Sequence, residues 1–289
     1  MEFIPKGSNK SYNNQLIFEY IDSKDKLTLP IFFKSLLDQT SITNMEEYTG
    51  FLYDTYGKDN NGVKNLLDQI YLIPNIPIEI LAKYYARFYT YESNFYKDIS
   101  NDLRSNNRDK YLPYIKVLYE GVNSKSLHLV NEKVLYRGSK LSNIEIKKLK
   151  DHLMTKSELP CAMILSKTFL EFTKDKNVAI KFLNHSYDNN DFSSVLFILE
   201  IDGNIGIDPS THFDLEHESY FPKEKSVLFF PFSCFEIKEI KENNLGKGLV
   251  YEIRLLYLGK YLKESENDTN RFSDSEFLKQ LSEYGFINK

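Results

Sequence analysis

At three places in this sequence, polar residues stand inside or beside apolar segments, and these residues could do chemistry. At the first place, Arg137 follows Val-Leu-Tyr and precedes Gly138, at the expected end of a strand. An arginine in this position, next to a glycine that allows close backbone approach, can clamp an anionic or planar ligand. The alternative is a surface arginine that closes a turn, and the local sequence alone favours that alternative.

The second place is a carboxylate and a hydroxyl on one expected strand. Side chains alternate between the two faces of a strand, so Glu171 and Thr173 should share one face. Leu170 and Phe172 should occupy the other face. Polar residues at a strand start usually face water, so this pair is a weak signal when taken alone.

The third place is a polar loop that enters an apolar strand. The loop carries two aromatic residues, Tyr220 and Phe221, which we expect to be exposed. Glu224 and Ser226 follow, and strand alternation predicts that they share a face. This pair is also a weak signal by itself.

Composition limits the class of protein that positions these residues. The chain has 289 residues, of which 37 are basic and 41 acidic, so its net charge is −4. That balance argues against a nucleic-acid partner held by a broad basic surface. Two cysteines and five histidines, none at helical i, i+4 spacing, predict no disulfide framework and no metal site. No apolar run approaches the roughly 20 residues of a membrane span.

The apolar spacing predicts helices over most of the first 130 residues. We expect them at about 31–37, 44–56, 77–88, 95–103 and 111–119. Thr90 is expected to cap the helix that carries Phe95 and Leu103. The aromatic residues that recur at helical spacing are assigned to the core.

From Lys133 onward the pattern changes to short strands rich in Val, Ile, Phe and Tyr. Strands are expected at 134–136, 163–173, 195–201, 205–207, 227–230, 235–240 and 249–256, with helices at 143–152 and 175–183. A helical block followed by a β block indicates an α+β protein. We expect a helical lobe over 1–130, a β-sandwich core over 131–262 and an acidic C-terminal tail over 263–289.

Together and in this order, the three places resemble the arginine–serine–glutamate class of mono-ADP-ribosyltransferases. Leu135-Tyr136-Arg137-Gly138 is similar to the aromatic-Arg-Gly segment of that family, and Ala179-Ile180-Lys181-Phe182 to its Ala-x-x-Phe segment. Val227-Leu228-Phe229 resembles the segment after the family's Glu-x-Glu. The stretch from Thr90 to Arg104 resembles the helix before the arginine strand, so the likeness covers about Thr90 to Leu258.

Two positions depart from the family pattern. The family has a Ser-Thr-Ser-type strand start before its Ala-x-x-Phe segment, and Glu171 stands where the first serine of that motif belongs. Ser226 stands where the second, catalytic glutamate of the Glu-x-Glu belongs. A serine cannot place negative charge beside the cationic ribose that forms when the nicotinamide bond of NAD breaks. The two departures are reciprocal, and our hypothesis is that Glu171 takes over the work of the absent glutamate. The alternative is neutral drift in a protein that has lost activity, or deliberate inactivation.

The resemblance implies a split, mostly antiparallel β-sandwich that binds NAD in its cleft as a substrate, without a metal. Arg137, next to Tyr136, would hold the diphosphate or ribose side of NAD. The backbone of Gly138 would anchor the nicotinamide amide, and Thr173 would order the site.

The resemblance also implies transfer of ADP-ribose to an arginine of a target protein. Glu171 and Ser226 would face the ribose, and Glu224 would polarise the acceptor guanidinium. Tyr220 and Phe221 would recognise the target, and we expect a monomer. Two alternatives stay open: a non-catalytic module that presents the loop to a partner, and NAD hydrolysis without a protein acceptor.

The end of the sequence predicts where the protein acts. An acidic stretch from Glu264 to Glu276 precedes apolar residues near Lys289, a pattern that resembles translocation signals of bacterial effectors. Met1 to Lys6 lack the start of a secretory signal. We therefore expect an effector that is secreted without an N-terminal signal peptide and acts in the host cytoplasm. The alternative is a cytoplasmic protein with an ordinary frayed terminus.

Overall fold

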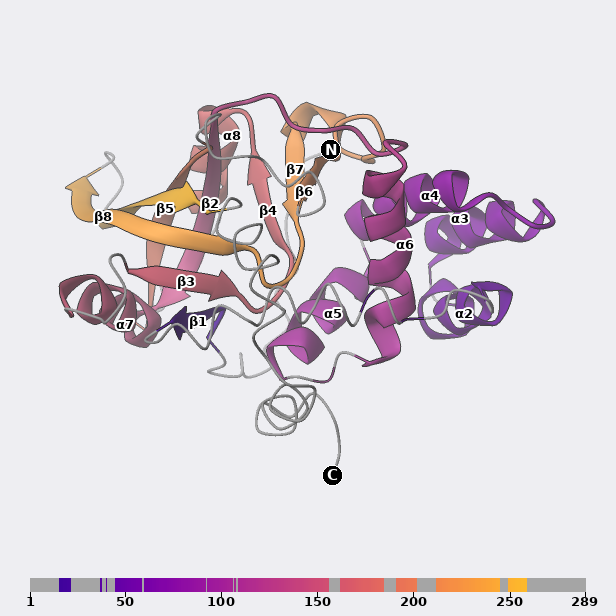
Figure 1. The fold of residues 1–289 in the computed structure, drawn as a ribbon, viewed down its shortest axis with the longest axis horizontal. Helices are drawn as coiled ribbons and strands as arrows, with labels where there is room; N and C mark the ends of the chain where they lie inside the picture. The colour runs from indigo at the N-terminus through magenta and orange to yellow at the C-terminus, as the bar shows by residue number, and fades with distance from the viewer. Residues whose placement is uncertain are drawn as a thin grey trace, which may run out of the picture.

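The computed structural model describes residues 16–21, 37, 40, 45–58, 60–91, 93–105, 107, 109–155, 162–184, 191–201, 212–244 and 249–258. These residues form an α+β structure, as expected. Most helices gather on one side of the molecule, beside one end of the sheet (Figure 1). Three expected features lie outside the described residues: most of the helix at 31–37, the strand at 205–207 and the tail at 263–289.

The helical side is built around buried aromatic rings. Its elements are α2 (Met45–Leu52), the π-helical turn η2 (Tyr53–Gly57), α3 (Asn61–Tyr71), α4 (Ile78–Thr90), α5 (Phe95–Arg104), η3 (Asp109–Tyr111) and α6 (Leu112–Asn123). Phe88, Phe95 and Tyr114 are fully buried, and their rings contact one another with centroids 4.5 to 6.4 Å apart. The assignment of these aromatic residues to the core is confirmed.

Thr90 does not cap α5, contrary to the expectation. It is the last residue of α4, and its hydroxyl donates to the Arg87 carbonyl. The backbone amide of Phe95 is satisfied instead by the hydroxyl of Ser93. The chain between the two helices places Ser93, and not Thr90, within reach of the first turn of α5.

The strands form one sheet over the described residues. They are β1 (Phe18–Ile21), β2 (Val134–Ser142), β3 (Met163–Ser166), β4 (Leu170–Thr173), β5 (Phe192–Glu200), β6 (His212–Asp214), β7 (Ser226–Phe229), β8 (Cys234–Asn244) and β9 (Leu249–Tyr257). Their order is β1-β3-β8-β9-β5-β2-β4-β7-β6. Neighbours run antiparallel except β5 and β9, which are parallel. The helices α7 (Asn143–Met154) and α8 (Lys176–Asn184) complete the fold.

The sheet is folded onto itself, so that two parts of it enclose a common core. In the described residues, one backbone-paired position, Tyr136↔Thr173, joins β2 to β4. The rings of Phe172 and Phe229, from β4 and β7, contact the ring of Phe235 from β8. In Figure 1, β3 and β8 cross the view while β4 and β7 run steeply against them. This is the sandwich-like arrangement that the resemblance implies.

Two predicted strand boundaries are wrong. The segment 163–173 is two strands, because Ser166 pairs through its backbone with Phe232 and Ser233 and the chain then crosses to the other part of the sheet. β2 continues to Ser142, well beyond the predicted end, and its backbone pairs with β5 throughout. The residues after Gly138 include polar ones, so the apolar pattern did not predict this part of the strand.

Two strands were also missed. β1, inside the range expected to be helical, and β6 contain only four and three residues, too few for periodicity to reveal them.

Candidate active site

Arg137 lies in the middle of β2, next to the joint of the sheet. It pairs across the strands with Phe197 of β5, and its neighbour Tyr136 forms the pair with Thr173. The predicted strand-end position is therefore wrong, and so is the alternative of a surface arginine that closes a turn. The half-buried residue lies where the two parts of the sheet join.

The guanidinium of Arg137 is bound to the backbone of the neighbouring strand. Its Nη1 donates to the carbonyl oxygen of Glu171 at 2.6 Å. Burial lowers the pKa of Arg137, while the charges of Glu171 and Tyr89 raise it. An arginine keeps its charge under these conditions, so the site contains a partly buried cation whose remaining N–H groups can serve a ligand.

Gly138 is required by helix packing. A Cβ atom at Gly138 would lie 1.9 Å from the carbonyl oxygen of Ala179 and 3.2 Å from the Cβ of Phe182. The close backbone approach expected at this glycine is therefore made by α8. Both Ala179 and Phe182 belong to the Ala-x-x-Phe segment, so the first two motifs are the two sides of one packing contact.

Glu171 and Thr173 share a face of β4, as predicted. Leu170 and Phe172 are buried in the core between the two parts of the sheet, whereas Glu171 is half-buried on the opposite face. The hydroxyl of Thr173 donates to the carbonyl of Glu224 at 2.6 Å and accepts the amide of Asp175 at 3.0 Å. Thr173 thus ties β4 to the loop before β7.

Ser226 is the first residue of β7 and lies directly opposite Thr173 in the antiparallel pair. Its side chain is 3% exposed. Glu171 pairs with Leu228, two residues further along, so Glu171 and Ser226 are diagonal neighbours on one face. Such neighbours are about 7–8 Å apart, within reach of a glutamate side chain.

Glu224 does not continue β7, so the expected alternation with Ser226 is wrong. It ends the 3-10 turn η5 (Pro222–Glu224), and Lys225 adopts a left-handed conformation with φ 50° before the strand begins. Glu224 nevertheless lies close enough to Glu171 for their charges to interact. Burial and the charge of Glu171 raise the pKa of Glu224 to about 7.

The helical side contributes Tyr89 and Arg104 to the same region. Burial raises the pKa of Tyr89, with a further increase from Glu171 and decreases from Arg137 and Arg104. Burial lowers the pKa of Arg104, as does Arg137. The Nε of Arg104 is buried without a hydrogen-bond partner among the described residues. The sequence did not predict Tyr89 and Arg104 as site residues. The resemblance of Thr90–Arg104 to a family helix indicated this region, but it indicated no individual side chain.

Of the two aromatic residues of the loop, Tyr220 is exposed, as expected, but its ring also contacts the helical side. The guanidinium of Arg87 lies 4.8 Å from the ring centre of Tyr220, and the Tyr91 ring lies 4.6 Å away. Phe221 is half-buried, and its amide donates to the hydroxyl of Ser219 at 2.9 Å. Tyr220 is therefore attached to the end of α4.

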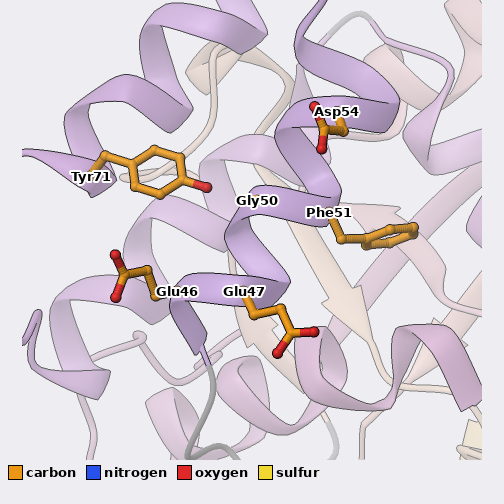
Figure 2. Close-up of a pocket in the computed structure, with 6 residues that line it drawn as sticks. All are labelled: Glu46, Glu47, Gly50, Phe51, Asp54 and Tyr71. Carbon is orange, nitrogen blue, oxygen red and sulfur yellow. The ribbon is translucent and has the colours of Figure 1, made fainter.

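A separate open depression of about 700 Å³ lies on the helical side (Figure 2). Its lining residues come from α2, η2 and α3: Glu46, Glu47, Gly50, Phe51, Asp54 and Tyr71. Figure 2 shows the Tyr71 side chain directed toward Gly50, whereas the Phe51 side chain is directed away from Tyr71. None of the predicted site residues lines this depression.

Metal ligands and membrane spans were searched for in the described part of the chain. No group of three or more His, Cys, Asp or Glu residues there could hold a metal ion. No helix in these ranges is both long and apolar enough to cross a membrane.

No family model and no curated protein matches this sequence. Several solved structures are similar in chain path. The Vis toxin, an ADP-ribosyltransferase from Vibrio splendidus, is 16% identical over 81% of this chain and 86% of its own, with a TM-score of 0.45. The ADP-ribosyltransferase HopU1 of Pseudomonas syringae is 15% identical over 72% and 87%, with a TM-score of 0.46. The type III effector XopAI from Xanthomonas axonopodis is 13% identical over 82% and 95%, with a TM-score of 0.48.

Proposed function

We propose that this protein cleaves NAD and transfers ADP-ribose to an arginine side chain of a target protein. One observation carries the proposal: an arginine, two carboxylates and two hydroxyls converge where β2, β4 and β7 meet. They are Arg137, Glu171, Thr173, Glu224 and Ser226. Cations suit the diphosphate of NAD, and carboxylates suit the ribose cation and the acceptor guanidinium.

Arg137 supplies the charge that binds the diphosphate or ribose side of NAD, with Tyr136 beside it. Arg104 lies near enough for the charge of Arg137 to lower its pKa. Two neighbouring cations, one of them with a buried N–H that has no partner among the described residues, favour a ligand with two negative charges. We assign the anchoring of the nicotinamide amide to the backbone of Gly138.

Glu171 stabilises the ribose cation as the nicotinamide bond breaks. A fixed carboxylate beside developing positive charge lowers the barrier because it acts more strongly on the transition state than on NAD itself. Ser226, diagonal to Glu171, contributes a hydroxyl to the ribose. Thr173 orders the site by holding the backbone of Glu224.

Glu224 prepares the acceptor. A carboxyl whose pKa is about 7 can accept a proton from, or polarise, a guanidinium at neutral pH. Its negative form also attracts an arginine side chain to the site. Tyr220 and Phe221, in the same loop, contact the target protein.

Incubating the purified protein with NAD and measuring free nicotinamide tests the proposal. Labelled NAD and a eukaryotic cell lysate provide the second measurement, which is label transferred to protein. Nicotinamide release with labelled arginine supports the proposed transfer. Release without labelled protein supports NAD hydrolysis alone, and no release supports the non-catalytic binding module.

We further propose that the protein acts as a monomeric bacterial effector on a host protein. The acidic C-terminal stretch with its apolar end supports this proposal. A transferase directed at host arginines needs delivery into the host cell, which such a tail provides.

A further inference from the structure

Tyr220 is attached to α4 by three separate contacts. The Arg87 guanidinium lies over its ring, with 4.8 Å between the guanidinium carbon and the ring centre. The Tyr91 ring meets it edge to face, with centroids 4.6 Å apart and planes at 82°. The backbone amide of Tyr220 donates to the hydroxyl of Thr90 at 3.1 Å, across 130 positions of sequence.

The same loop is fixed at its other end by β4. The hydroxyl of Thr173 donates to the carbonyl of Glu224, and the amide of Lys174 donates to the carbonyl of Lys225 at 3.1 Å. Glu224 therefore lies between two anchors, one on the sheet and one on α4.

We propose that Arg87, Thr90 and Tyr91 form a clamp on Tyr220 that positions the Glu224 turn beside Glu171. These three are positioning residues, and they act through Tyr220 and the loop backbone. This inference rests on the proposed function, because it assigns the clamp to the step in which Glu224 prepares the acceptor. Cleavage of NAD itself depends on Arg137 and Glu171, which β2 and β4 hold without the clamp.

The test measures the loop and the two half-reactions separately. Arg87→Gln removes the cation from an exposed side chain, and Tyr220→Leu removes the ring. Agmatine, a small guanidinium, serves as the acceptor. We expect kcat/KM for agmatine to fall about tenfold or more in both variants. NAD hydrolysis without agmatine should change by less than about twofold in Arg87→Gln.

Hydrogen exchange follows the loop without relying on activity. The amides of 219–225 should exchange faster in Arg87→Gln and Tyr220→Leu than in the wild type. Arg87→Lys keeps a cation over the ring and should restore most of both properties. Lys150→Gln is the matched control, because Lys150 lies over the Tyr251 ring at 4.5 Å but on α7, at a distance from the loop.

Unchanged exchange in Arg87→Gln and Tyr220→Leu overturns the clamp. Faster exchange with equal loss of transfer and hydrolysis overturns its assignment to the acceptor step. If the wild type releases no nicotinamide, the proposed function fails. In that case faster exchange still supports a clamp on the loop, and unchanged exchange overturns it.

Discussion

At the scale of single residues, the site brings two carboxylates and a cation close together. Arg137 donates to the backbone of Glu171, and Glu171 in turn raises the pKa of Glu224. Arg137 contacts Glu171 through its backbone, and Glu171 acts on Glu224 through its charge, so substitutions here should affect separate steps in measurably different ways.

The first residue-scale prediction concerns Arg137. Arg137→Lys keeps the positive charge but loses the planar fork that makes two parallel hydrogen bonds. We expect weaker NAD binding, by about tenfold, measured by calorimetry. Equal affinity in the wild type and the variant would show that Arg137 does not hold NAD.

The second tests whether Glu171 replaces the missing glutamate. Glu171→Ser should reduce nicotinamide release by about a hundredfold or more, because the ribose cation loses its carboxylate. Adding Ser226→Glu to that variant should restore activity, since the two side chains are diagonal neighbours. If Glu171→Ser is silent and Ser226→Glu alone activates the protein, Glu171 is a bystander.

The third concerns Glu224 and pH. Its pKa of about 7 lies above the ordinary 4.5, so between these values the folded protein binds more protons than the unfolded chain. The free energy of unfolding should therefore fall as pH rises from 4.5 to 7. Urea unfolding at pH 5 and pH 8 measures this decrease in the free energy of unfolding. Glu224→Gln should remove the part of the decrease that Glu224 causes.

The same residue should govern the pH dependence of transfer. Transfer to agmatine should rise through pH 7 in the wild type, because Glu224 is then negative, and should lose this rise in Glu224→Gln. NAD hydrolysis should keep its pH profile. Glu79→Gln, at an exposed carboxylate on α4, is the control and should change neither measurement. Parallel loss of transfer and hydrolysis would assign Glu224 to NAD cleavage.

Alternation along β4 predicted the shared face of Glu171 and Thr173, because four extended residues obey a simple period. It failed at Glu224, where one left-handed residue, Lys225, breaks the period. The contact between Thr90 and Tyr220 could not be predicted locally, since it joins residues 130 positions apart.

At the scale of elements, the packing of α8 on β2 decides where Arg137 lies. This contact depends on Gly138, whose missing side chain leaves room for the Ala179 carbonyl. The sequence suggested the Arg-Gly segment and the Ala-x-x-Phe segment as separate motifs. Only the structure shows that they pack against each other.

Gly138→Ala should destabilise the protein strongly. The new methyl group would meet the Ala179 carbonyl at 1.9 Å, so α8 must move away from β2. We expect a loss of about 1–3 kcal/mol or more in the free energy of unfolding. Gly57→Ala is the control, because its nearest neighbour lies at 3.4 Å. Equal melting temperatures for the two variants would contradict this packing argument.

At the scale of the whole molecule, the composition and the spacing of apolar residues were sufficient to predict the α+β class. They were not sufficient to predict the order of the strands in the sheet. The long apolar segments predicted most helices and strands correctly. The crossing between β3 and β4 was missed because the break between the two strands contains only three residues.

One whole-molecule prediction concerns the segment after the sheet. Deleting residues 264–289 should leave nicotinamide release unchanged, because the proposed site lies wholly on β2, β4, β7 and the adjoining loop and helices. The deletion should abolish delivery of the protein from the producing bacterium into a host cell, measured with a reporter fusion. Unchanged delivery would remove the role of this segment, and lost nicotinamide release would make it part of the catalytic domain.

Thr173 has two attachments: its backbone joins the two parts of the sheet at Tyr136, and its hydroxyl holds the carbonyl of Glu224. Thr173 therefore connects the position of Glu224 to the line along which the two parts of the sheet join. A small rotation of β4 about that seam would change the separation between Glu224 and Arg137. Movement of the loop when a target protein docks would therefore reach the proposed ribose site through Thr173 and through the adjoining contact of Lys174 with Lys225.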